Sequence, residues 1–129
     1  MPEPIQLRGE RPHSRLVLIR LGRNTLTDRH LEATSEDAFD KWGLFGFSTF
    51  GLADGGYPEL ARFVPLVPYR QWVMEAGTDD LIADGFPLLP SNDHPHWTVV
   101  LSEPSPTQFA RVRRHFSEAM RNPVWVGRR

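Results

Sequence analysis

The residues best suited to chemistry in this sequence lie in one short run, His94-Pro95-His96-Trp97-Thr98. A histidine titrates near neutral pH and can move a proton, and a nearby hydroxyl can hold a phosphate oxygen or orient the ring. Side chains two residues apart on a strand share a face, so His96 and Thr98 would project together from a strand. We therefore take His96 as the candidate proton-transfer residue, Thr98 as its hydroxyl partner and His94 as a second histidine.

The segment His96-Trp97-Thr98-Val99-Val100-Leu101, followed by a short loop and a helix, resembles one half of a 2H phosphoesterase. That family uses two His-x-Ser/Thr strands that face each other, with one histidine as base and one as acid. The resemblance implies metal-independent chemistry on cyclic phosphodiesters of RNA or nucleotides. The candidate for a second half is His13-Ser14-Arg15, in which Arg15 stands where the family has a hydroxyl. Arg15 is instead a candidate for balancing phosphate charge.

Two other interpretations of these histidines are open. His96 can be a strand-edge residue whose ring bonds to backbone carbonyls, with Pro95 fixing the turn before it. His94 and His96 can instead bind a metal together with Asp93, because two imidazoles on one side of an extended segment can share an ion. No further ligand follows at a fixed spacing, so we expect no metal site and no cofactor.

A second group of candidates lies in the C-terminal part of the chain. Arg111, Arg114 and Arg121, together with Glu118, fall at spacings of 3, 4 and 3 and would share one face of a helix. Such a mostly basic stripe can follow a nucleic-acid backbone, and Trp125 can stack on a base. A solvated helix face explains the same pattern, because about one in four residues of any soluble protein is charged.

Charge is unevenly distributed along the chain. Residues 1–26 hold five arginines against two acids, residues 27–93 hold four bases against twelve acids, and residues 94–129 hold six arginines against two acids. If the two ends come together, as chain termini often do, they would form one basic face on an acidic body. Such a face would suit a phosphate group or an acidic protein partner.

The overall composition excludes several classes of protein. The 129 residues contain no cysteine, which excludes a disulfide framework, a thiolate metal site and a cysteine nucleophile. The longest unbroken apolar run, Leu16 to Ile19, is too short to cross a bilayer, and the N-terminus carries prolines and an acid where a signal peptide would be apolar. We therefore expect a cytoplasmic protein with no membrane partner. Lys41 is the only lysine among 15 basic residues, which is typical of GC-rich bacterial genomes.

The clearest predicted element is a helix near the C-terminus. Ser105-Pro106-Thr107-Gln108 is a capping box with proline at the first helical position. Apolar residues then recur at helical spacing as far as Met120, and the Asn122-Pro123 pair predicts the end of the helix.

The remaining elements alternate between strands and helices. We expect strands at 16–19, 44–50, 69–75 and 97–101, a last short strand at 124–126, and helices within 24–42, 58–63 and 78–85. The pattern predicts a single compact two-layer domain of the α/β or α+β class. It would contain a mixed sheet of about four strands and three or four helices, packed mainly on one face. Residues 1–12 would form a flexible N-terminal arm.

Two functions fit these observations, and the oligomeric state is open in both. The first, which the sequence favours, is a small bacterial interaction protein of the immunity, antitoxin-like or mobile-element accessory type that binds a protein or nucleic-acid partner. The second is a metal-independent enzyme, for example a ribonuclease toxin, that processes phosphodiesters in RNA or nucleotides. In that case His96 would transfer protons together with His94 or His13.

Overall fold

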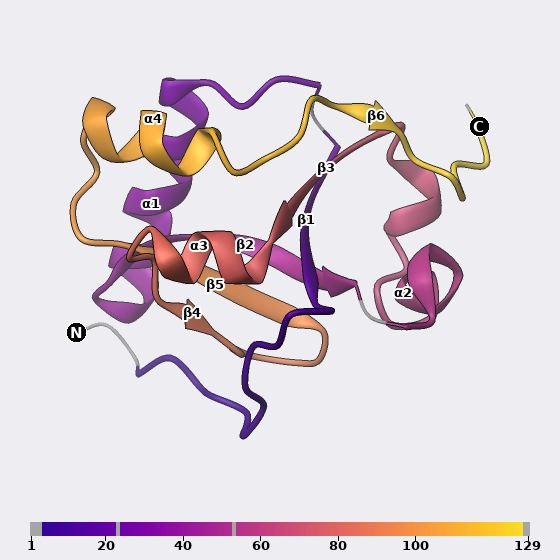
Figure 1. The fold of residues 1–129 in the computed structure, drawn as a ribbon, viewed down its shortest axis with the longest axis horizontal. Coiled ribbons are helices and arrows are strands. Elements are labelled where there is room, and N and C mark those ends of the chain that lie inside the picture. Colours follow the sequence, from indigo (N-terminus) through magenta and orange to yellow (C-terminus); the bar gives the residue numbers. More distant parts are fainter. Residues whose placement is uncertain (1–3, 23, 53, 128–129) are drawn as a thin grey trace.

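The computed structural model describes residues 4–22, 24–52 and 54–127. Within these ranges the chain forms four α-helices, one 3-10 helix (η1) and a six-stranded sheet in the order β4-β5-β2-β1-β3-β6 (Figure 1). The elements are β1 Val17–Leu21, α1 Asp28–Trp42, β2 Phe45–Leu52, α2 Gly56–Phe63, η1 Val67–Tyr69, β3 Trp72–Gly77, α3 Thr78–Ala83, β4 Leu88–Leu89, β5 His96–Leu101, α4 Pro106–Arg113 and β6 Met120–Arg121.

The predicted class and number of helices are confirmed, but the sheet differs from the prediction in two ways. It has six strands within the described residues, not about four, and every strand pair is antiparallel, so the sheet is not mixed. The strands β4 and β6 contain two residues each, which is too short to leave a periodic pattern in the sequence. A helix between two strands usually marks a parallel crossover, yet α1 connects the antiparallel neighbours β1 and β2.

The central strand β1 is covered on both faces, as its continuous apolar run predicts. Leu18 and Ile19 are adjacent in sequence, point to opposite faces and are both 0% exposed. Leu18 packs in a core with Leu31 of α1, Leu81 of α3 and residues of α4. Ile19 packs on the other side with residues of α2 and η1, among them Tyr57, Leu60 and Val67. Three of the four described helices therefore lie on one face, and α2 lies on the other.

Two helices begin with a side-chain cap, and the cap of the second, Ser105, is the one that the sequence predicts. The Thr27 side chain accepts a hydrogen bond from the His30 backbone N–H at 3.1 Å, and α1 continues unbroken until Gly43, whose φ of 76° ends it. The Ser105 side chain accepts a hydrogen bond from the Gln108 N–H at 3.2 Å at the start of α4.

Within residues 4–22, 24–52 and 54–127, no helix is long and apolar enough to cross a membrane.

The helix α4 is shorter than predicted, because the chain beyond it pairs with β3. It ends at Arg113, whereas the apolar spacing predicts a helix that continues to the Asn122-Pro123 pair. The backbone N–H of Ser117 donates to the carbonyl of Glu75 at 2.8 Å, and the Ser117 hydroxyl accepts from the Glu75 N–H at 3.1 Å. These bonds hold the chain against β3, and the last strand forms at 120–121 instead of 124–126.

The two ends of the described chain lie at opposite edges of the sheet, so the expected shared basic face is not formed (Figure 1). The N-terminal arm lies beside the segment that follows β4. Leu7 forms a bridge with Ser91, and the Arg8 N–H donates to the carbonyl of Pro90 at 2.7 Å. The C-terminal segment forms β6 at the far edge. Residues 6–8 of the arm, which we expected to be flexible, therefore have backbone partners.

The close approach of β2 and β5 at Gly46 gives a testable prediction. A Cβ at this position would lie 2.7 Å from the carbonyl oxygen of Val99 and 2.9 Å from Cγ2 of Thr98. Since the carbonyl belongs to the strand backbone, Gly46→Ala should lower the free energy of unfolding by about 1–3 kcal/mol, measured by urea denaturation. Gly9→Ala is the control, because nothing lies within 4 Å of its added Cβ. An unchanged stability for Gly46→Ala would contradict this packing.

Candidate functional site

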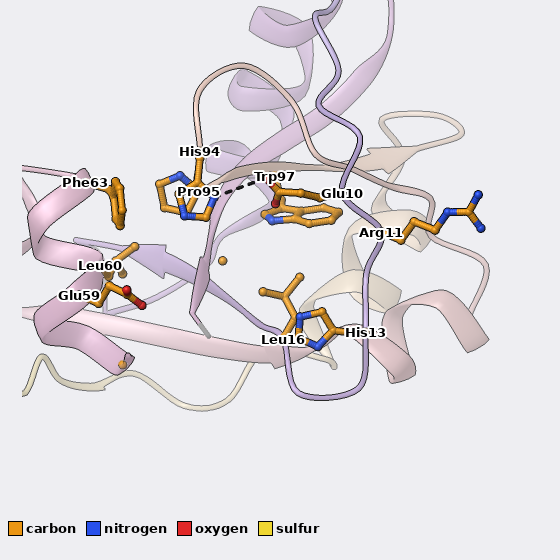
Figure 2. A pocket seen from close by; sticks show the side chains of 12 residues that line it. Glu10, Arg11, His13, Leu16, Glu59, Leu60, Phe63, His94, Pro95 and Trp97 are labelled. Atoms are coloured by element: carbon orange, nitrogen blue, oxygen red, sulfur yellow. Dashed lines mark ion pairs between the residues drawn. The ribbon is translucent and has the colours of Figure 1, made fainter. Parts of the chain in front are cut away.

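A cavity of about 460 Å³ lies between the N-terminal arm, the start of α2 and the turn before β5 (Figure 2). Its apolar base includes Leu16, Gly51 and Trp97, which belong to the ends of neighbouring strands or to the residue beside them. A Cβ on Gly51 would lie 2.9 Å from Nε1 of Trp97 and 3.0 Å from Cδ1 of Leu16. Glycine at this position therefore lets the Trp97 ring lie directly against β2.

His94 lies on one wall of the cavity and faces a carboxylate. Its Nδ1 is 3.5 Å from Oε1 of Glu10, and both side chains are about half exposed. Glu10 also accepts a hydrogen bond from Nε of Arg8 at 2.9 Å. The Arg8 guanidinium donates further to the carbonyls of Ser91 at 2.7 Å and Asn92 at 3.1 Å. The hydrogen bond from Arg8 holds the pKa of Glu10 below its usual range, so this carboxylate is ionised at neutral pH.

His13 lines the same cavity from a different segment, beside Leu16 (Figure 2). Its side chain is exposed, but its backbone is fixed. The carbonyl of His13 accepts hydrogen bonds from the Leu16 N–H at 3.0 Å and from the Thr78 hydroxyl at 2.8 Å. The Thr78 hydroxyl, which is buried at the start of α3, is also 3.1 Å from the carbonyl of Leu16. The turn that carries His13 is therefore held against α3.

The remaining walls mix charge with apolar surface. The Phe63 ring at the end of α2 meets the His94 ring edge-on, with 4.9 Å between their centroids. Glu59, one turn earlier on α2, and Arg11 from the arm supply further charges. The cavity can thus receive a ligand that has both an apolar and a charged part, and two imidazoles are available to donate or accept protons.

His96 and Thr98, the first sequence-based candidates, lie together on β5 but do not line this cavity. Both contact Ser91, whose hydroxyl oxygen is 2.9 Å from Nδ1 of His96 and 2.7 Å from the Thr98 hydroxyl. The carbonyl of Ser91 is also 3.2 Å from the same His96 nitrogen. Ser91 and Thr98 are buried, and the His96 ring is half-buried against Phe50. A catalytic role for His96 and Thr98 stays a prediction.

The candidate phosphate-binding arginines are distributed over different elements. Arg111 of α4 pairs with Asp84, with 3.0 Å between Nη2 and Oδ1. Arg114 is exposed directly after α4, and Arg15 is exposed in the turn before β1. Because α4 ends at Arg113, the predicted stripe through Arg121 does not lie on one helix face.

Arg121 and Trp125 do come together at the β6 edge. The Arg121 guanidinium lies over the Trp125 ring at 5.2 Å from its centroid and over the Trp72 ring at 5.6 Å. Neither Arg121 nor Trp125 lines the cavity. Their proposed contact with nucleic acid stays a prediction.

Several residues of the site were missed by sequence analysis. Glu10 lies in the arm that we expected to be flexible, and Ser91 lies in a loop without a motif. Phe63 was expected only to close a short helix. Only the long-range pairing of the arm with residues 90–92 brings Glu10 to His94, and no local pattern encodes that pairing. Among the described residues, no group of three or more potential ligands could hold a metal ion, so Asp93 does not form one with His94 and His96.

The half-buried imidazole of His96 gives a prediction about pH. Burial, with the charges of Arg8 and Arg20, lowers its pKa below the usual 6.5, against the opposing effect of the hydrogen bond from the ring to the Ser91 carbonyl. The unfolded chain therefore binds more protons below about pH 6.5, and stability falls as the pH drops from there towards the folded pKa. Between about pH 7.5 and about pH 5, the wild type should lose more unfolding free energy than His96→Gln in urea titrations. Equal losses would show that this ring is not desolvated.

Comparison of this chain with protein-family models, with curated proteins and with solved structures finds no match. The cavity and the side chains that line it are therefore the basis on which a function can be inferred.

Proposed function

We propose that this protein is a metal-independent enzyme that cleaves phosphodiester bonds in RNA or nucleotides, with the protons transferred in the cavity. One observation carries the proposal. His13 and His94, which come from segments about 80 residues apart, line the same cavity, and a carboxylate faces one of them. Two imidazoles at one site can supply the acid and the base of such a reaction.

The surroundings of His94 suit a general acid. Its Nδ1 faces the ionised carboxylate of Glu10, which pairs with the protonated form of the ring. Its Nε2 has no hydrogen-bond partner among the residues that the structure describes, so this nitrogen is available to a ligand. A histidine whose second nitrogen is held by a carboxylate is also fixed in orientation. We therefore assign proton donation to Nε2 of His94.

His13 then acts as the general base. It takes the proton of the ribose 2′-hydroxyl, whose oxygen forms a bond to phosphorus. The bond from phosphorus to the 5′-oxygen breaks, and His94 gives its proton to that leaving oxygen. The products are a 2′,3′-cyclic phosphate and a free 5′-hydroxyl, so atoms and charge balance.

His96 and Thr98 have a supporting role in this proposal. Their contacts with Ser91 fix the loop whose carbonyls, at Ser91 and Asn92, accept hydrogen bonds from Arg8. Arg8 in turn holds Glu10 at His94. The alternative of a non-catalytic interaction protein, which the sequence favours, stays a prediction. The enzyme is preferred here because the cavity combines two histidines with a positioned carboxylate.

The proposal predicts metal-independent cleavage that depends on both histidines. A labelled dinucleotide and a labelled single-stranded RNA, each incubated in EDTA, should yield 2′,3′-cyclic phosphate ends. His94→Gln and His13→Gln should each reduce kcat/KM by about 100-fold or more, because each removes one proton-transfer group. Glu10→Gln should reduce it by about tenfold, since the ring would lose its orienting charge.

A matched histidine control is His115→Gln. The His115 Nε2 is 2.7 Å from Oδ2 of Asp84, and this histidine does not line the cavity. Its loss should lower thermal stability and leave kcat/KM unchanged. All variants are purified in parallel with the wild type. Cleavage that survives in both His94→Gln and His13→Gln, or a wild type that cleaves neither substrate, would overturn the proposal.

A further inference from the structure

Apolar side chains remain exposed between the end of α2 and the end of η1, and one of them, Phe63, also lines the cavity. Phe63 is 51% exposed, Leu66 is 56% exposed and Tyr69 is 54% exposed. Val126 in the C-terminal tail is 50% exposed. Since large apolar side chains are costly to leave in water as a group, such a surface commonly binds another molecule.

The C-terminal tail and η1 form one continuous surface. The Val126 N–H donates to the carbonyl of Pro68 at 2.9 Å, and the Asn122 side chain donates to the carbonyls of Val67 at 2.7 Å and Arg70 at 2.9 Å. Figure 1 shows the tail beside α2. We name this the α2–tail surface, which consists of Arg62, Phe63, Leu66, Tyr69, Arg70, Arg121, Trp125 and Val126.

The charge on the α2–tail surface is entirely positive. Residues 60–70 and 119–127 contain three arginines and no acid. Arg62 and Arg70 are exposed, and neither has an ion-pair partner among the residues that the structure describes. Arg121 lies over the Trp125 ring. The surface therefore favours a partner that is negatively charged.

The α2–tail surface is also continuous with the cavity, because Phe63 belongs to both. Its ring meets His94 edge-on inside the cavity, and half of its side chain is exposed to solvent.

We propose that the α2–tail surface binds single-stranded nucleic acid, whose reacting phosphodiester lies in the cavity. Planar rings such as Phe63 and Tyr69 can stack on successive bases, and arginines beside them can pair with phosphates. An acidic protein would match the charge, but only a nucleic acid would also place a phosphodiester at His94, which Phe63 contacts. The placement of the reacting phosphodiester rests on the proposed function, whereas binding to the surface does not.

The test is fluorescence anisotropy with a labelled single-stranded DNA of about 12 nucleotides, which lacks the 2′-hydroxyl and is not cleaved. Three arginine–phosphate contacts predict that affinity falls roughly 20-fold when salt rises from about 50 to about 200 mM. Tyr69→Ala should weaken binding about tenfold through lost stacking. Arg70→Gln should weaken it and flatten the salt dependence.

Phe39→Ala and Arg29→Gln on α1 are the matched controls, because both residues are exposed and lie outside the α2–tail surface. They should bind the DNA as the wild type does. Binding that depends on Tyr69 in a protein that cleaves no RNA would support this surface and overturn only the proposed function. Dinucleotide cleavage with DNA affinity unaffected by Tyr69→Ala would overturn this surface and leave the function in place. No DNA binding at low salt would also overturn it, in favour of a protein partner.

Discussion

The burial of β1 on both faces is the constraint on which the rest of the structure depends. Leu18 and Ile19 are both fully buried, although they point in opposite directions. One face is covered by α1, α3 and α4, and the other is covered by α2 and η1. A strand with two apolar faces cannot remain at an edge, so β2 and β3 pair on either side of it.

The position of the cavity follows from this arrangement. Since α2 must cover the second face, the chain leaves the end of β2 and begins α2 beside the first residues of β5. The arm must reach Leu16 to enter β1, and it pairs with residues 90–92 on its way. The arm, α2 and the turn before β5 therefore enclose a space at one end of the sheet. Gly51 lets Trp97 form its base, because any larger residue would collide with the indole.

Local patterns predicted the elements better than their connections. The capping box at Ser105 and the apolar run at β1 were sufficient to place the start of α4 and the central strand. The predicted end of α4 was wrong because Ser117 forms hydrogen bonds with Glu75 of β3. These two residues are 42 positions apart in the sequence, so no local pattern indicates the contact. Likewise the site was predicted only in part. The histidine-rich run predicted His94 as a site residue. Glu10 lies near His94 only because the N-terminal arm pairs with residues 90–92, which are distant in the sequence.

The structure also separates the histidines by environment, which the sequence could not do. His96 lies on a strand, contacts Ser91 through Nδ1, and has its pKa lowered mainly by burial. Burial therefore favours the neutral form of this ring. His94, two residues earlier, lies in the turn before the strand, where solvent reaches its ring and Glu10 faces its Nδ1. Because Ser91 contacts His96 and also accepts a hydrogen bond from Arg8, the strand histidine helps to position the carboxylate that faces the cavity histidine.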